Sequence, residues 1–186
     1  PAPAAPKPRP RAAAGEVTVQ LTVPRAAAKA APKPRPQATS RRVAPPVRAA
    51  SAQQRMEQAV ARIPGYHRGA ASWVLSNAYG SWGTADWYHD RVYISPRVPA
   101  SRIYDVVSHE WAHLQSVRAY AGNVTAATTA MNRWFGGSNL VGAERAADCM
   151  ARQLGARWTN YTTCADGHGQ QGARLLLRGQ PLPAAR

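Results

Sequence analysis

The stretch Ser101-Arg-Ile-Tyr-Asp-Val-Val-Ser-His-Glu-Trp-Ala-His-Leu-Gln-Ser-Val-Arg-Ala-Tyr120 carries the strongest structural signal in the chain. Its apolar residues recur at the spacing of one helix face: Ile103, Val106, Val107, Leu114 and Val117. Gly122 follows where a glycine can end a helix. The pattern predicts one helix from about Ser101 to Tyr120, with His-Glu-x-x-His in its middle.

The two histidines of this helix can hold one metal ion. His109 and His113 are four residues apart, so their imidazoles lie on one helix face. Glu110 is rotated to the side, where its carboxylate can take a proton from water at the open position of the ion. Two imidazoles and a carboxylate favour Zn²⁺ over other ions, and a third protein ligand is then needed.

A second pair at the same spacing supplies the missing ligand. Glu144 and Asp148 are also four residues apart on an expected helix, so both carboxylates share a face. We expect Glu144 to bind the ion and Asp148 to accept the free ring N–H of His109.

These motifs resemble those of the gluzincin metallopeptidases, and the run Glu144-Arg-Ala-Ala-Asp-Cys149 is similar to small bacterial neutral zinc metallopeptidases. The resemblance covers about residues 88 to 155. It implies a zinc-dependent peptidase, an endopeptidase rather than an exopeptidase, acting on a peptide or protein. It also implies zinc ligation by His109, His113 and Glu144, with Glu110 as general base, Asp148 as the partner of a ligand, and an edge strand at residues 92–94 that receives the substrate.

Other residues are candidates for contact with the substrate. We expect His168, in the run Asp-Gly-His-Gly, to stabilise the oxyanion, with Tyr120 and Tyr161 as alternatives. Trp82 and Trp87 lie in a turn-rich segment and are the tryptophans most expected to face the substrate. The other four tryptophans fit core packing.

Cys149 and Cys164 are the only cysteines, and their spacing suits a disulfide. Such a bridge would stabilise the fold by about 3 kcal/mol on the loop-entropy model. Two reduced buried thiols and zinc ligation are the alternatives.

The expected class is α+β and mainly α, with a zincin-like helix after a short β element. We expect a strand at residues 91–95. Helices are expected at residues 51–63, 68–77, 101–120, 125–135, 138–155 and 170–178.

Composition divides the chain near residue 50. Residues 1–50 hold 15 Ala, 11 Pro and ten Lys or Arg without an aromatic residue, so we expect a disordered basic tail before one domain at 51–186. The net charge of +15 suits a polyanionic partner of the tail, a wall polymer or an anionic membrane, although a plain linker fits as well. We expect a monomer with no sequence-specific nucleic-acid partner.

An Ala/Pro-rich start without Met fits a mature secreted or cell-envelope protein of a bacterium. The second function class consistent with the sequence is a non-catalytic, metal-containing envelope module that binds a polyanion. Glu110 favours a peptidase, because a structural zinc site has four protein ligands and no need of a base.

Limited proteolysis tests the tail. We expect a protease to remove residues 1–50 first and to leave a resistant fragment that begins near residue 50. A truncated chain lacking residues 1–50 should keep the melting temperature of the full chain. A large fall in that temperature would contradict the boundary.

Overall fold

The computed structural model describes residues 49–184 and has the α+β, mainly helical class expected from the sequence. The tail and the position of its boundary lie outside the described residues, so both stay predictions. The described elements are, in order, α1 (Ala52–Ala61), β1 (Ser72–Leu75), β2 (Gly83–Asp86), β3 (Arg91–Ile94), α2 (Ile103–Arg118), α3 (Val124–Phe135), α4 (Val141–Gln153) and α5 (Gly167–Leu177).

The three strands form one small sheet in the order β1-β3-β2. β1 runs parallel to β3, and β2 runs antiparallel to it, so β3 has a partner on each side. The side chains of Val92 and Ile94 on β3 are fully buried. The expectation that residues 92–94 form an edge strand is therefore wrong, and the edge strand that borders α2 is β2.

The expected helix at residues 68–77 is also wrong, because this stretch contains β1. Trp73 and Leu75 alternate with more exposed residues, and their backbone pairs with Val92 and Ile94 of β3. A strand of four residues is stable only through such pairing, and here the partner lies about 20 residues further along the chain.

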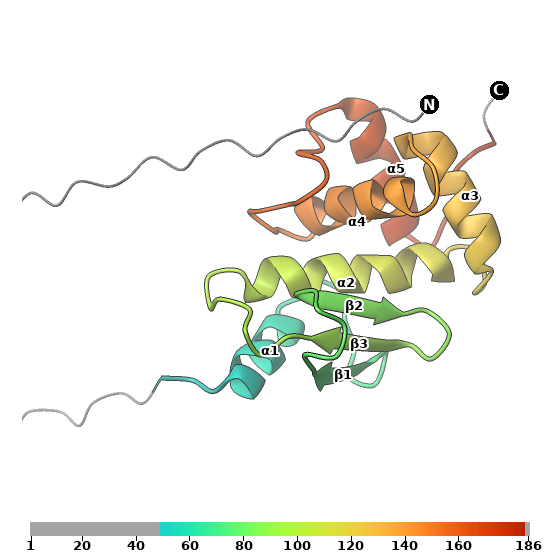
Figure 1. Cartoon of the computed structure of the whole chain (residues 1–186). Coiled ribbons are helices and arrows are strands. Elements are labelled where there is room, and N and C mark those ends of the chain that lie inside the picture. Colours follow the sequence, from blue (N-terminus) through green and yellow to red (C-terminus); the bar gives the residue numbers. More distant parts are fainter. Residues whose placement is uncertain (1–48, 185–186) are drawn as a thin grey trace, which may run out of the picture. The chain divides into compact units, whose positions relative to one another are not determined.

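Helix α2 lies across the middle of the molecule, with the sheet and α1 on one side and α4 on the other (Figure 1). Val107, Trp111 and Leu114 pack into one apolar core with α1 and the sheet. Ala112 and Val117 pack into a second core with α3, α4 and α5. One helix thus contributes to both cores, so the residues of its motif lie between the sheet on one side and α4 on the other.

Two helices begin three residues away from the expected positions. α4 begins at Val141, three residues after Ser138. α5 begins at Gly167, before the expected start at Gln170, because the Asp166 side chain accepts a hydrogen bond of 2.6 Å from the Gly169 amide. This cap places His168 in the first turn of a helix.

Cys149 of α4 and Cys164, in the segment before α5, form a disulfide with α-carbons 5.1 Å apart. Neither sulfur is therefore available as a zinc ligand. Within residues 49–184, no helix has both the length and the apolar character needed to cross a lipid bilayer.

Gly142 is required by the close approach of α3 and α4. A Cβ atom at this position would lie 2.4 Å from the Asn132 α-carbon, in the backbone of α3. We expect Gly142→Ala to lower the free energy of unfolding by about 1–3 kcal/mol, because the two helices must separate. Urea denaturation measures the change.

Gly167→Ala is the matched control, because a Cβ atom at Gly167 has no neighbour within 4 Å. It should leave stability unchanged or raise it by less than about 1 kcal/mol. Equal stability of the two variants would contradict the steric explanation.

Candidate metal centre

Three side-chain atoms converge between α2 and α4. The Nε2 atoms of His109 and His113 are 3.2 Å apart, and they lie 3.0 and 3.5 Å from the Glu144 Oε2 atom. Ligand atoms about 2.0–2.1 Å from a tetrahedral ion, the bond length typical of zinc, are about 3.3 Å from one another. The donor types and their separations therefore fit a divalent ion bound by all three residues.

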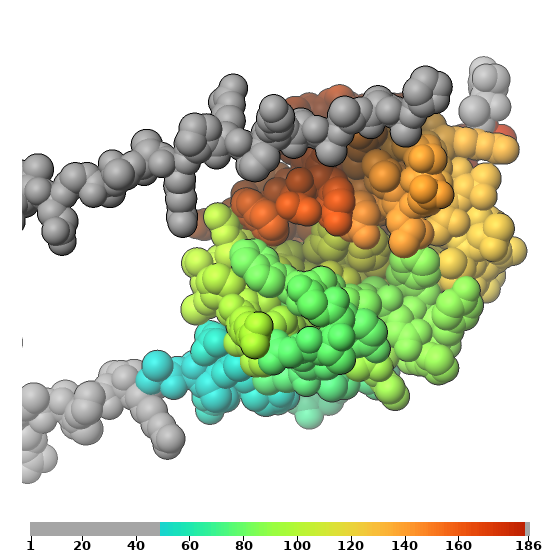
Figure 2. All heavy atoms as spheres, viewed as in Figure 1, coloured from blue at the N-terminus to red at the C-terminus, as the bar shows by residue number. Residues whose placement is uncertain are grey.

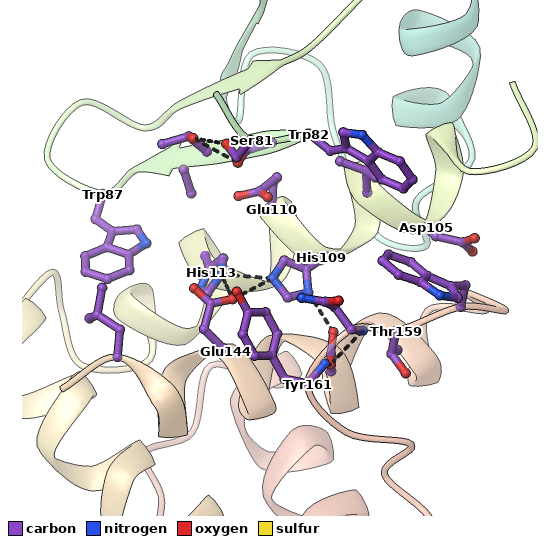
Figure 3. A pocket seen from close by; sticks show the side chains of 18 residues that line it. Ser81, Trp82, Trp87, Asp105, His109, Glu110, His113, Glu144, Thr159 and Tyr161 are labelled. Carbon is purple, nitrogen blue, oxygen red and sulfur yellow. Dashed lines mark hydrogen bonds and ion pairs between the residues drawn. The ribbon is translucent and has the colours of Figure 1, made fainter. Parts of the chain in front are cut away.

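The ligands come from helix faces that point at each other (Figure 3). His109 and His113 lie one turn apart on α2, while Glu144 lies in the first turn of α4. A carboxylate in the first turn of a helix is stabilised by the partial positive charge of the exposed amides there. The spacing that the sequence predicts therefore brings the three ligands together from two helices.

Asp148 lies one turn after Glu144 and is almost fully buried. The Nδ1 atom of His109 lies 2.9 Å from the Asp148 Oδ1 atom, so Nδ1 donates to Asp148 and Nε2 faces Glu144, where it could bind an ion after losing its proton. The other oxygen, Oδ2, accepts the backbone N–H groups of Asn160, Tyr161 and Thr162 at 3.1, 2.5 and 2.9 Å. Sequence reasoning finds the first role of Asp148 and misses the second.

His113 is held in a different way. Its Nδ1 atom is buried, and no side chain or backbone group of the described residues forms a hydrogen bond with it. Its ring instead packs against Trp87, with the ring centres 5.9 Å apart. The orientation of His113 is therefore set by aromatic packing, whereas that of His109 is set by a carboxylate.

Glu110 faces β2 and takes no part in the ligand cluster. Only 7% of its surface is exposed, and a Cβ atom at Gly83 would overlap its carboxylate. Burial raises the pKa of Glu110, while the nearby His113 and His109 partly oppose this effect. The glycine thus makes room for a buried, basic carboxylate next to the ligands.

These residues open into a cleft of about 790 Å³. Figure 2 shows the hollow between the green surface around β2 and the orange to red surface of α4 and the segment that follows it. Trp82 and Trp87 line the cleft, as the sequence suggests. Residues that sequence reasoning does not select also line it, among them Ser81, Thr84, Asp105, Leu140, Trp158 and Thr159.

His168 does not line the cleft, so its expected role in oxyanion stabilisation is wrong. Its ring stacks on Trp134 with ring centres 4.2 Å apart, and its Nε2 atom donates to the Trp134 carbonyl. Tyr120 does not line the cleft either, and its hydroxyl accepts the backbone N–H of Leu182. Of the three candidates, Tyr161 alone lines the cleft, with its ring stacked over His109.

Comparison with known proteins adds no family, since no family model, curated protein or solved structure matches the chain. The interpretation of the site therefore rests on its own geometry and chemistry.

The ligand cluster has a definite charge state in the metal-free protein. Burial lowers the pKa of His109, but the hydrogen bonds to Asp148 and Glu144 outweigh it and raise the pKa to about 10. Burial likewise raises the pKa of Glu144, but the hydrogen bonds from His109 and His113 outweigh it and hold this pKa well below its ordinary value. Around neutral pH the cluster thus contains an imidazolium and a carboxylate.

This charge state predicts how the stability of the chelator-treated protein depends on pH. The contribution of His109 is complete below its unfolded-state pKa of 6.5 and is lost as the pH rises through about 10. The contribution of Glu144 is present above its unfolded-state pKa of 4.5 and is lost as the pH falls through its lowered folded-state pKa. Stabilisation by the pair is therefore greatest between about pH 4.5 and 6.5.

We expect the melting temperature of the chelator-treated protein to fall between pH 6.5 and 10. The fall should be smaller in His109→Gln, which lacks the titrating ring. Thermal denaturation followed by circular dichroism measures both curves. Parallel curves for the two proteins would contradict the assigned charge state.

Proposed function

We propose that the chain is a zinc-dependent peptidase of the gluzincin type that hydrolyses internal peptide bonds. The observation that carries the proposal is the cluster of His109, His113 and Glu144 ligand atoms, all within 4.8 Å of one another, beside the buried carboxylate of Glu110. A structural zinc site normally has four protein ligands and has no use for a buried carboxylate that stands beside the ligands without joining them.

Zinc suits this donor set because two imidazoles and one carboxylate leave a fourth position open. When bound, the ion supplies Lewis acidity, which polarises a carbonyl and makes water a stronger acid. The imidazoles of His109 and His113 and the carboxylate of Glu144 hold it. Asp148 keeps His109 in the tautomer whose Nε2 atom can bind, and thereby raises the basicity of that ligand.

Glu110 moves the protons in the proposed reaction. Its carboxylate takes a proton from the attacking water and gives it to the leaving amine nitrogen. A raised pKa suits both steps, because the group must accept a proton readily and release it in the same cycle. Tyr161 is the candidate donor to the oxyanion: burial raises the pKa of its phenol, so the hydroxyl keeps its proton near neutral pH.

The edge strand β2 is the proposed support for the substrate backbone. Gly83, Thr84 and Ala85 of this strand line the cleft, and within residues 49–184 only one side of β2 is paired, with β3. An extended peptide can add to such an edge through main-chain hydrogen bonds. The cleft continues past the ligands toward both Trp82 and Trp87, which supports cleavage within a chain (Figure 3).

A secreted or envelope location is part of the proposal, and the disulfide supports it because such bonds persist in oxidising compartments. A polyanionic partner of the basic tail remains a sequence-based proposal. The competing function is a metal-containing module that binds without catalysis, and Glu110 is the residue that separates the two.

We expect Glu110→Gln to keep its zinc and to lose peptide hydrolysis by a factor of about 10² to 10⁴, because the amide keeps the size of the side chain without its basicity. Zinc content by atomic absorption and the cleavage rate of an unstructured protein measure the two properties. An active Glu110→Gln variant would refute the mechanism, and a zinc-loaded wild type that cleaves nothing would favour the binding module.

Two further variants serve as controls. His113→Ala removes a ligand and should lose zinc and activity together. Asp148→Asn should weaken zinc binding by about 10 to 100 fold, because it loosens His109 without removing it.

A further inference from the structure

Two apolar walls stand at opposite ends of the cleft, and neither takes part in the proton transfers of the proposed hydrolysis. Trp82 immediately precedes β2, and Trp87 immediately follows it. The four residues of β2 lie between them, and a strand of this length spans about 13 Å. Figure 3 shows the two side chains on opposite sides of Glu110 and the ligand histidines.

The first wall is a pair of tryptophans. The rings of Trp82 and Trp158 are 5.7 Å apart, and 40% of the Trp82 surface is exposed. The Arg102 guanidinium lies over the Trp158 ring, 5.2 Å from its centre, and holds this ring by a cation–π interaction.

Trp87 and Leu140 both line the cleft, and we assign them to the second wall. Trp87 is fixed by its packing on His113, while Leu140, in the turn before α4, is 48% exposed. The two walls thus come from both sides of the cleft, and each combines a held ring with a more exposed apolar side chain.

Exposed apolar surface is concentrated at this cleft. Of the seven large apolar side chains that are exposed in the described residues, three line it: Trp82, Leu140 and Tyr161. A cluster of this kind at a concave site marks binding of apolar groups, whereas isolated exposed apolar residues need no explanation.

The charges of the cleft select against acidic groups. Among the described residues that line it, none is Lys or Arg, whereas Asp105, Glu110, Glu144 and Asp148 all line it. Asp105 is partly neutralised by Arg102 at 3.6 Å, and Glu144 and Asp148 are engaged with His109. An acidic substrate side chain would leave water and enter a site that already holds four carboxyl groups, where Arg102 is paired with Asp105 and His109 with Glu144 and Asp148.

We propose that the two walls are side-chain subsites on opposite sides of the scissile bond. The substrate is then an extended peptide with an apolar side chain within two residues of the bond on each side and with no acidic one there. This inference deepens the proposed peptidase function and rests on it, because a scissile bond exists only if the chain cleaves peptides. The two subsites themselves rest on the cleft alone.

The expected size of the selectivity follows from apolar burial. Filling a pocket with an apolar side chain changes transition-state binding by about 1–3 kcal/mol, which corresponds to a factor of about 10 to 200 in kcat/KM. Each wall should supply a factor in this range, and the two factors should multiply because the walls are far apart.

The test uses the zinc-loaded full chain and fluorogenic octapeptides that carry Leu, Ser or Glu on one side of the bond at a time. We expect Leu to exceed Ser by a factor of about 10 to 200 in kcat/KM on each side, with Glu the poorest. Trp82→Ala should remove the preference on one side, and Leu140→Ala should reduce it on the other. Loss on the same side in both variants, or in neither, would overturn the proposal.

Tyr79→Ala is the matched control, because Tyr79 is an exposed aromatic residue that packs on Tyr93 and does not line the cleft. It should keep both preferences. Zinc content is measured in every variant, so that loss of the ion is not mistaken for loss of a subsite.

Binding separates this inference from the proposed function. The same peptides are titrated against Glu110→Gln by fluorescence anisotropy, and the Leu peptides should bind at least about tenfold more tightly than the Glu peptides. If the wild type cleaves no peptide but this order of binding holds, the peptidase function fails and the subsites stand. Equal affinity for Leu and Glu peptides would overturn the subsites whether or not cleavage occurs, as would tighter binding of a neutral oligosaccharide.

Discussion

One buried carboxylate, that of Asp148, joins the candidate metal centre to the wall of the cleft. Its Oδ1 atom holds His109, and its Oδ2 atom holds three consecutive backbone amides around Tyr161. A charged group with about 1% exposure is costly unless it is fully hydrogen-bonded, and here both oxygens are engaged. The orientation of a ligand and the position of the cleft wall are therefore two consequences of one side chain.

The disulfide restrains the same segment, residues 160–164, at its C-terminal end. Cys149 follows Asp148 in α4, and its partner Cys164 lies two residues after the last amide that Asp148 binds, that of Thr162. The segment that carries Tyr161 is thus fastened to α4 by a covalent bond at one point and by three hydrogen bonds at another. A loop restrained in this way loses little further entropy when a ligand packs against it, which suits a segment that forms one wall of a binding cleft.

The site residues that the sequence predicts correctly are those whose relative positions are determined by a single helix. His109 with His113, and Glu144 with Asp148, share faces because of the helical repeat, so their convergence needs only that α2 and α4 pack together. β1 and β2 lack such a local signal, since each has four residues and depends on pairing with β3. The central position of β3 depends on the same pairing and was beyond prediction from the alternation of its own residues.

The error at His168 has a different origin, because a local signal was present. Asp166 three residues before Gly169 has the spacing of a helix cap, but the expected helix begins only at Gln170, after the glycines around His168. No local pattern in the sequence indicates that Asp148 accepts three backbone amides or that Gly83 makes room for Glu110. Both depend on backbone atoms from distant segments, and the sequence does not specify which amides a carboxylate will meet.

His109 and Glu110 lie next to each other on α2 but face different elements, so the proposed base and the candidate ligands can be altered separately. Neighbouring residues on a helix point about 100° apart, so His109 faces α4 while Glu110 faces β2. The ligands are set by α4 through Asp148 and Glu144, and the environment of the base is set by the sheet through Gly83. A change in the sheet can thus alter the basicity of Glu110 while the geometry of the ligands persists. A change in α4 does the reverse, so the metal binding and the proton transfer that we propose would depend on opposite walls of one cleft.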